Sequence, residues 1–195
     1  SPELKVPKSA QAFFANIDLP SSKSIANRAM VMDALWCQLR KLSFYGQSLD
    51  VKDLWQLFSE YHHASRVYVG NGGTTFRFAL AFLATQAKRP IELVAGEQVS
   101  QRPWRPLFNA LNALGTQLSA EMKQGRLSIH IEPAEKLLKR EIEVEVAQTS
   151  QFASALALVG PKLPQGLLLH FKETPVSKSY LQMTDHLLRA SGISS

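Results

Sequence analysis

Short apolar runs with strand periodicity and longer segments with helical periodicity follow one another along this chain. Apolar or alternating runs predict strands at residues 12–19, 42–45, 66–69, 91–95, 141–147 and 167–171, and a hairpin of residues 117–120 and 126–131 around Gln124-Gly125. Helical spacing predicts helices at residues 23–36, 51–61, 74–85, 150–159 and 178–190, and one more that has Pro103 in its first turn and ends at Gly115. Strand, polar turn and helix therefore recur, which predicts a single α/β (α+β) domain.

Five of the expected helices begin at a short polar cluster that holds Ser, Thr or Gly together with Lys, Arg or Gln. The clusters lie at residues 21–28, 71–77, 100–103, 148–151 and 176–180. A helix N-terminus presents unpaired backbone N–H groups and roughly half a positive charge. Several such ends aimed at one place would bind phosphate and carboxylate groups, so the pattern predicts a small ligand with several negative charges.

The composition adds an excess of basic residues to this pattern. The 195 residues carry a net charge of +6, with 45% hydrophobic and 19% charged residues, as in an ordinary globular protein. The chain has no Lys/Arg runs and no interleaving of basic and aromatic residues, so a nucleic-acid-binding module is the weaker reading. The other explanation of the positive net charge is an ordinary solvated surface that binds no ligand.

Cysteine and histidine usage points away from redox and metal chemistry. The lone Cys37 falls in an apolar stretch expected to be helical, which favours a buried, unreactive thiol. The five histidines lack the spacing of metal ligands, so we expect no metal. No apolar run is long enough for a membrane span and the start is polar, so we expect a cytoplasmic protein.

Two clusters carry the strongest ligand signal, and each has a structural alternative. Ser24 and Arg28 lie four residues apart beside Lys23, which suits one phosphate group, but an N-cap serine with two exposed basic residues would look the same. The loop of residues 70–77 follows a strand and lets a ligand approach its glycines, or else is only a tight turn. It matches neither a phosphate-binding loop of the Walker type nor a dinucleotide fingerprint.

The other clusters are less specific when taken one at a time. Arg102 precedes Pro103, and one arginine there could be structural. Thr149, Ser150 and Gln151 place two hydroxyls and an amide at a helix start, one of which capping alone explains. Ser177 and Tyr180 flank Lys178, and Tyr180 could equally be a half-buried core residue. No convincing general acid–base pair accompanies these groups, which suggests half of an active site.

The clusters together resemble the EPSP synthase (3-phosphoshikimate 1-carboxyvinyltransferase) family. The matching segments, in the family's order and approximate spacing, are Leu19-Pro-Ser-Ser-Lys-Ser-Ile-Ala-Asn-Arg28, Gly70-Asn-Gly-Gly-Thr-Thr-Phe-Arg77, Gln101-Arg-Pro103, Thr149-Ser-Gln-Phe152 and Val176-Ser-Lys-Ser-Tyr180. The resemblance implies transfer of an enolpyruvyl group from phosphoenolpyruvate to shikimate 3-phosphate, in aromatic amino-acid biosynthesis, without cofactor or metal. It also implies a fold of two lobes, each built from βαβαββ-type units around a pseudo-threefold axis.

The resemblance also assigns roles by motif. The residues it places on shikimate 3-phosphate are Lys23, Ser24, Arg28, Thr149, Ser150, Gln151, Ser177 and Tyr180. The residues it places on or around phosphoenolpyruvate are Lys23, Asn71, Gly73, Thr74, Arg77, Arg102 and Gln151. Lys23 would contact both ligands, and Asn71, Thr74 and Arg77 would shape the loop. None of these is a catalytic residue beyond the positioning role of Lys23.

The chain departs from the family mainly in length. It is about half as long as family members, so we expect one lobe over residues 1–195, with a leading strand segment at 1–19 and the lobe body at 20–195. The second lobe, which supplies the catalytic acid and base groups, would be the missing partner. We therefore expect a monomer that is inactive by itself. The stretch between Tyr61 and Gly70 is also short, so a hairpin is expected to be missing there.

One related enzyme family remains an alternative, and a non-catalytic module that binds anions or nucleic acid is another. UDP-N-acetylglucosamine enolpyruvyl transferases carry a reactive cysteine in a mobile loop and a Lys-Asn pair at the first helix. Here Lys23 is followed by Ser24, and Cys37 is expected on a helix body, both of which argue against that family.

Overall fold

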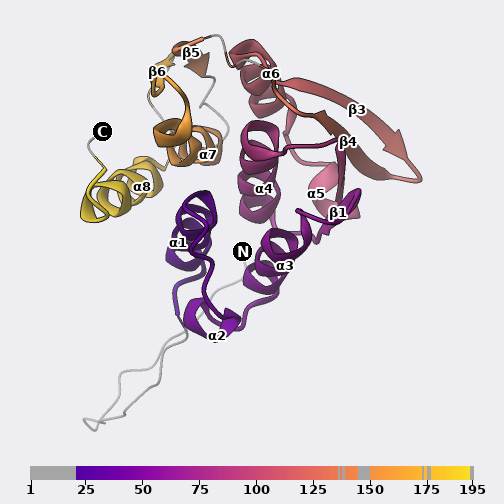
Figure 1. The fold of residues 1–195 in the computed structure, drawn as a ribbon, viewed down its shortest axis with the longest axis horizontal. Helices are drawn as coiled ribbons and strands as arrows, with labels where there is room; N and C mark the ends of the chain where they lie inside the picture. The colour runs from indigo at the N-terminus through magenta and orange to yellow at the C-terminus, as the bar shows by residue number, and fades with distance from the viewer. Residues whose placement is uncertain are drawn as a thin grey trace, which may run out of the picture.

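The computed structural model describes residues 21–135, 137, 139–144, 150–172, 174 and 177–193. Three helices come first: α1 (Lys23–Leu35), α2 (Leu42–Tyr45) and α3 (Leu49–Glu60). Two groups of strands and helices follow. Helices α4 (Gly73–Gln86) and α7 (Gln151–Val159) lie side by side at the centre of the molecule (Figure 1). The strand expected at residues 12–19 lies outside the described residues.

The strand expected at residues 42–45 is wrong, because these residues form the short helix α2. Aromatic and apolar residues favour strands only where a neighbouring strand can pair with them. Here the ring of Tyr45 is buried instead, and its hydroxyl donates to Asp33 Oδ2 at 2.6 Å and accepts from the backbone N–H of Arg40 at 3.0 Å. Packing against α1 therefore decides the conformation of this segment.

The expectation for Cys37 is also wrong. Helix α1 ends at Leu35, and Cys37 is exposed with a left-handed φ of 57°. The apolar stretch continues past the point at which the chain turns, so hydrophobicity alone places the helix end too late. The thiol is therefore not part of the core.

Residues 66–132 form a complete βαβαββ unit. Its elements are β1 (Arg66–Val69), α4 (Gly73–Gln86), β2 (Ile91–Ala95), α5 (Glu97–Ser100), α6 (Arg105–Leu114), β3 (Gln117–Lys123) and β4 (Arg126–Glu132). The sheet order is β1-β2-β4-β3, with β1 and β2 parallel and the other pairs antiparallel. No strand lies between α3 and β1, as the short spacing there predicts. Pro103 lies before α6 rather than in its first turn, which Pro106 occupies.

The predicted hairpin is confirmed and is longer than expected. Gln124 and Gly125 both have positive φ, 49° and 78°, so they form the mirror-image turn that matches strand twist. Lys123 lies opposite Arg126, which fixes the register of the whole β3–β4 ladder.

Residues 141–190 repeat the βαβα part of that unit. The repeat consists of β5 (Glu141–Val144), α7 (Gln151–Val159), the 3₁₀ turn η1 (Gly160–Lys162), β6 (Leu168–Phe171) and α8 (Lys178–Ala190). Strands β5 and β6 pair in parallel, as β1 and β2 do. The last helix has the bounds predicted from the sequence.

Helix α4 is the centre of the core and is buried on nearly all sides. Phe76, Phe78, Leu80 and Leu83 each expose at most 1% of their surface. The helix packs against α1, α3, α6 and α7. Among the described residues, no helix is long and apolar enough to cross a membrane. Since α4 is fixed on all sides, its N-terminus is a rigid place for a site.

Candidate functional site: converging helix N-termini

Arg28 joins the starts of three helices. The side chain is 1% exposed and lies on the second turn of α1. Its Nε donates to Thr184 Oγ1 at 2.7 Å, and its Nη1 donates to the carbonyl oxygen of Ser24 at 2.8 Å. Its Nη2 donates to the carbonyl oxygen of Tyr180 at 3.2 Å and to Ser154 Oγ at 3.4 Å. The guanidinium therefore ties α1 to α7 and α8.

Arg77, on α4, also joins helix starts through its guanidinium. Its Nη1 donates to the carbonyl oxygen of Gly73 at 2.9 Å and to Gln151 Oε1 at 2.5 Å, and its Nη2 donates to the carbonyl oxygen of Pro103 at 2.9 Å. The start of α4, the start of α7 and the segment before α6 are thus joined at one guanidinium. Burial is the main cause that lowers the pKa of Arg77 to about 10, and the nearby charge of Arg102 adds to it.

Gly73 lies where these groups meet. A Cβ atom built on Gly73 would lie 2.7 Å from Arg77 Nη1, 3.0 Å from Arg102 Nη1 and 3.7 Å from Gln151 Oε1. Among the described residues, no carboxylate pairs with Arg77 or Arg102. Two adjacent guanidinium groups at a helix N-terminus, without a counter-charge, favour binding of an anion.

Lys23 is held beside this cluster by an aspartate that the sequence analysis does not single out. Lys23 Nζ lies 2.8 Å from Asp50 Oδ2, and the side chains are 53% and 23% exposed. Asp50 stands in the first turn of α3, and its carbonyl oxygen accepts from Thr75 Oγ1 at 3.3 Å. The carboxylate also borders the Gly72 turn. Asp50 therefore links the start of α1 to the start of α4.

Replacing Asp50 by asparagine is expected to raise the affinity of the chain for inorganic phosphate several-fold. The change frees the Lys23 ammonium and removes a negative charge beside the anion-binding groups. Phosphate titration followed by NMR at low ionic strength would measure it. The matched control is Glu97→Gln, which removes another first-turn carboxylate paired with a basic side chain, Arg126. Unchanged or lower phosphate affinity for Asp50→Asn would show that Asp50 positions Lys23 rather than competes with the anion.

The glycine-rich loop is shaped by contacts behind it. Asn71 Oδ1 accepts from the backbone N–H of Gln98 at 3.0 Å, so its amide holds α5. Asp53 Oδ2 accepts from the backbone N–H of Gly70 at 3.1 Å, and burial is the main cause that raises the pKa of Asp53. A Cβ on Gly96 would come within 2.9 Å of the Gly70 backbone. These contacts set the direction in which the loop enters α4.

The remaining predicted residues stand at the same helix starts. Ser24 is partly buried in the first turn of α1, and Thr74 in the first turn of α4. Ser150 is buried at the N-cap of α7, where its side chain makes no capping bond. Ser177 is the N-cap of α8 with a φ of 58°, and Tyr180 is 44% exposed. Thr149 lies outside the described residues.

One metal-like cluster forms that sequence spacing could not show. Side chains of Glu92, Glu121 and His130, from three neighbouring strands, place ligand atoms within 4.8 Å of one another. Glu92 is already paired with Arg66 at 2.6 Å, and Glu121 with Lys123 at 2.5 Å. The carboxylates are thus neutralised by protein cations, as is usual on the outer face of a sheet.

Comparison with known proteins identifies the family of the chain. The family model for EPSP synthase (3-phosphoshikimate 1-carboxyvinyltransferase) matches residues 17–194. A 3-phosphoshikimate 1-carboxyvinyltransferase of Bacteroides fragilis is 33% identical over 181 residues, which are 92% of this chain and 43% of that protein. The corresponding protein of Bifidobacterium longum is 28% identical over 91% of this chain and 46% of its own length.

A solved structure shows the same fold. EPSP synthase from Acinetobacter baumannii superposes with a TM-score of 0.67 at 18% identity, over 91% of this chain and 44% of that one. The chain thus spans less than half the length of the relatives it matches. The matched region includes every described helix start that carries a predicted ligand group, and the chain belongs to the EPSP synthase family.

Proposed function

We propose that these 195 residues form the shikimate 3-phosphate-binding lobe of an enolpyruvyl transferase and do not catalyse the transfer by themselves. The observation that supports the proposal most directly is the meeting of Gly73, Arg77, Arg102 and Gln151 at one point, where the described part of the chain places two cations and no carboxylate. Family membership favours this reading over the related UDP-N-acetylglucosamine transferases. A cytoplasmic location and a monomeric state stay predictions.

The proposed roles follow from position. Arg102 is exposed beside Gly73, so it can turn toward the carboxylate or phosphate of phosphoenolpyruvate. Lys23 lies at the edge of the same cluster and would bridge the two ligands once it leaves Asp50. Ser24, Thr149, Ser150, Gln151, Ser177 and Tyr180 would surround shikimate 3-phosphate from α1, α7 and α8. Asn71, Thr74 and Arg77 would hold the loop.

Arg28 has a special place in the proposal. All of its nitrogen atoms already donate to protein oxygens, so in this structure it holds the helix starts together. Any contact between Arg28 and shikimate 3-phosphate would need one of these bonds to be exchanged for a bond to the ligand. Its proposed role is therefore first to position the groups that bind, and second to bind.

The proposed lack of catalysis is based on the side chains that this lobe places near its helix starts. Enolpyruvyl transfer needs groups that move protons to and from the reacting carbons and hydroxyl. Among the described residues, the carboxylates beside the starts of α1 and α4 are Asp50, which pairs with Lys23, and Asp53, which accepts from the loop backbone. Both are occupied in holding the loop and the lysine. The residues that move protons would then come from outside this lobe.

The test measures binding and turnover separately. We expect the 195-residue chain to bind shikimate 3-phosphate in the millimolar range, more tightly than inorganic phosphate, and to release no phosphate from phosphoenolpyruvate. Weak binding is expected because each missing charge-assisted hydrogen bond costs about 1.5–3 kcal/mol. NMR titration and a coupled phosphate-release assay would measure these two properties.

Matched variants locate the binding. Lys23→Ala should weaken binding of shikimate 3-phosphate, whereas Lys52→Ala, an exposed lysine on α3, should not. Turnover above the blank, or micromolar binding of phosphoenolpyruvate, would contradict the proposal. Tight binding of oligonucleotides with a steep salt dependence would instead identify a nucleic-acid-binding module.

A further inference from the structure

Arg102 follows directly on α5, a helix of only four residues (Glu97–Ser100). The backbone N–H of Arg102 donates to the carbonyl oxygen of Val99 at 3.0 Å, which continues the turn of this helix. A single helical turn has few backbone bonds of its own, so contacts with neighbouring segments must set its direction. The direction of α5 in turn decides where the exposed Arg102 stands relative to Gly73.

The side chain of Ser100, the last residue of α5, ties this helix to strand β4. Its hydroxyl donates to the carbonyl oxygen of Gly96 at 2.8 Å and accepts from the backbone N–H of Leu127 at 2.8 Å. Ser100 is 5% exposed and Leu127 is fully buried. A buried N–H that loses its acceptor is costly, so this hydroxyl holds the two segments together.

The register of the sheet explains why Leu127 needs such a partner. Lys123 and Arg126 flank the two-residue turn, and in a hairpin of this kind they form a hydrogen-bonded pair. The N–H of Leu127 therefore points away from β3 and toward β2. Strand β2 pairs with β4 only as far as Val94, and the chain then turns away into α5. The Ser100 hydroxyl thus supplies the acceptor that a further paired residue of β2 would have supplied.

The glycine-rich loop holds α5 from its other side. Asn71 Oδ1 accepts from the backbone N–H of Gln98 at 3.0 Å. The N–H of Gly96 donates to the carbonyl oxygens of Val69 and Gly70, at 2.9 and 3.3 Å. Helix α5 is therefore fixed between the loop that leads into α4 and the hairpin of β3 and β4.

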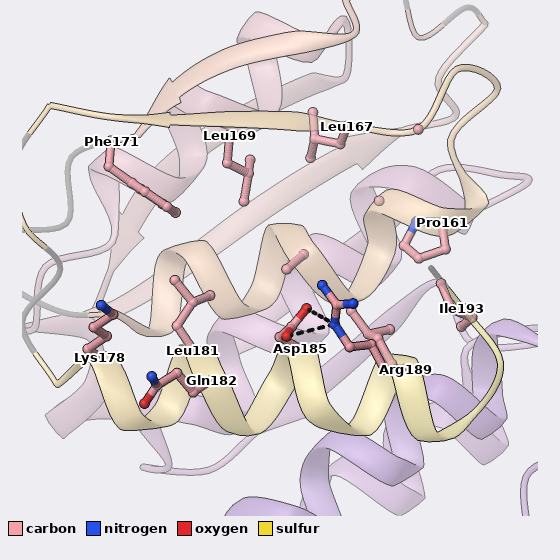
Figure 2. Close-up of a pocket in the computed structure, with 14 residues that line it drawn as sticks. Pro161, Leu167, Leu169, Phe171, Lys178, Leu181, Gln182, Asp185, Arg189 and Ile193 are labelled. Atoms are coloured by element: carbon pink, nitrogen blue, oxygen red, sulfur yellow. Dashed lines mark hydrogen bonds and ion pairs between the residues drawn. The ribbon is translucent and has the colours of Figure 1, made fainter. Parts of the chain in front are cut away.

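The second unit shows the corresponding strand without a neighbour such as β4. Among the described residues, β6 pairs only with β5. Figure 2 shows Leu167, Leu169 and Phe171 directed from this strand toward the helices, over a hollow of about 590 Å³. The chain that follows β2 thus has a support, β4 with its bond to Ser100, that the described part of the second unit lacks.

We propose that Ser100 is a positioning residue for the anion that Arg102 and Gly73 bind. The inference rests on the proposed function, which places phosphoenolpyruvate at this point. The contacts run from β4 through the Ser100 hydroxyl to α5, and from α5 to Arg102, whose Nη1 lies 3.0 Å from the position of a Cβ on Gly73. An arginine that is held in place before the ligand arrives loses less freedom on binding, which raises affinity.

The test replaces Ser100 by alanine in the full 195-residue chain. Without ligand, we expect amide exchange at Leu127 to become about tenfold faster, because its N–H loses a buried acceptor. The NMR signal of Arg102 Nε–H should show greater mobility. Phosphoenolpyruvate and inorganic phosphate, titrated separately and followed at the Gly73 amide, should bind about fivefold more weakly. Shikimate 3-phosphate, followed at α8, should bind within about twofold of the unchanged chain, because its proposed ligands lie on α1, α7 and α8.

The matched control is Ser128→Ala, the same change at the residue that follows Leu127 in β4. Ser128 is 3% exposed, and its hydroxyl donates to Glu92 of β2 rather than to α5. This variant should leave the mobility of Arg102 and the anion affinity unchanged. If Ser100→Ala fails to fold by circular dichroism, Ser100→Cys takes its place with the same expected directions, since a thiol is a weaker donor and acceptor than a hydroxyl.

Two results would overturn the proposal. In the first, the Ser100 variant leaves the Arg102 signal or the anion affinity unchanged. In the second, Ser128→Ala weakens anion binding as much as the Ser100 variant does. An unchanged chain that binds neither anion at Gly73 would refute the proposed function instead. The mobility of Arg102 is measured without ligand, so it would still decide whether Ser100 positions the arginine.

Discussion

Replacing Gly73 by alanine is expected to weaken binding of phosphoenolpyruvate and inorganic phosphate at least tenfold, a loss of about 1.4 kcal/mol or more. The new methyl group would lie 2.7 Å from Arg77 Nη1 and 3.0 Å from Arg102 Nη1. Arg77 is fixed by its bonds to three other residues, so it can yield little. The exposed Arg102 must move away, and the methyl group fills space that the anion needs.

The same change should leave the fold nearly unaltered. Alanine favours a helix over glycine by up to about 1 kcal/mol, which offsets part of the steric cost. Binding measured by NMR titration, together with a thermal melt, separates these effects. Ser59→Ala, an exposed position on α3 away from the anion-binding groups, is the control and should retain the affinity. A Gly73→Ala chain that binds phosphate as well as the unchanged chain would show that the anion does not lie at this glycine.

Local turn chemistry explains which elements could be predicted from the sequence. Strands β1 and β2 and helix α8 have the bounds expected, and α4 and α7 begin within one residue of the expected start. In each case a glycine, serine or proline marks the change of direction, and the apolar period is clear on both sides. The Gln124-Gly125 hairpin belongs to the same class, since its two positive φ values suit glycine and are tolerated by few other residues.

The wrong predictions share a different cause. Residues 42–45 have strand-like composition, but the buried hydroxyl of Tyr45 finds its partners, Asp33 and the Arg40 backbone, only when the segment turns into a short helix. Cys37 continues an apolar stretch, yet the chain leaves α1 two residues earlier. In both cases contacts between segments override the conformation that the local sequence favours, and no local sequence pattern indicates those contacts.

The candidate site likewise has a part that local sequence order predicts and a part that depends on contacts between distant segments. That polar residues gather at helix starts could be read from the sequence, because capping and helix dipoles depend on local order. Which of these residues meet in the folded chain could not be read from the sequence. Arg28 bonds to Thr184 across 156 residues, and Arg77 bonds to Gln151 across 74. The structural alternative for the first cluster required two exposed basic residues, and it fails because Arg28 is buried. Asp50 was missed because a carboxylate in a first helical turn is usually explained by the helix alone.

Replacing Arg28 by methionine is expected to cost about 3 kcal/mol of unfolding free energy, which lowers the melting temperature by about 6–12 °C for a chain of this size. Methionine fills much of the same volume, so the loss comes from the hydrogen bonds. Thr184 Oγ1 and the carbonyl oxygens of Ser24 and Tyr180 would each lose a charged donor. Chemical denaturation and a thermal scan would measure the change.

The control for this prediction is Arg126→Met, an arginine that is 48% exposed and pairs with Glu97 at the surface. It should leave the unfolding midpoint unchanged, because exposed ion pairs contribute little. Burial lowers the pKa of Arg28 to about 10, so the folded chain already bears a desolvation cost for this charge. If that cost exceeded the value of the bonds, Arg28→Met would stabilise the chain. Such a result would mean that the arginine is kept for its ligand and not for the joining of α1, α7 and α8.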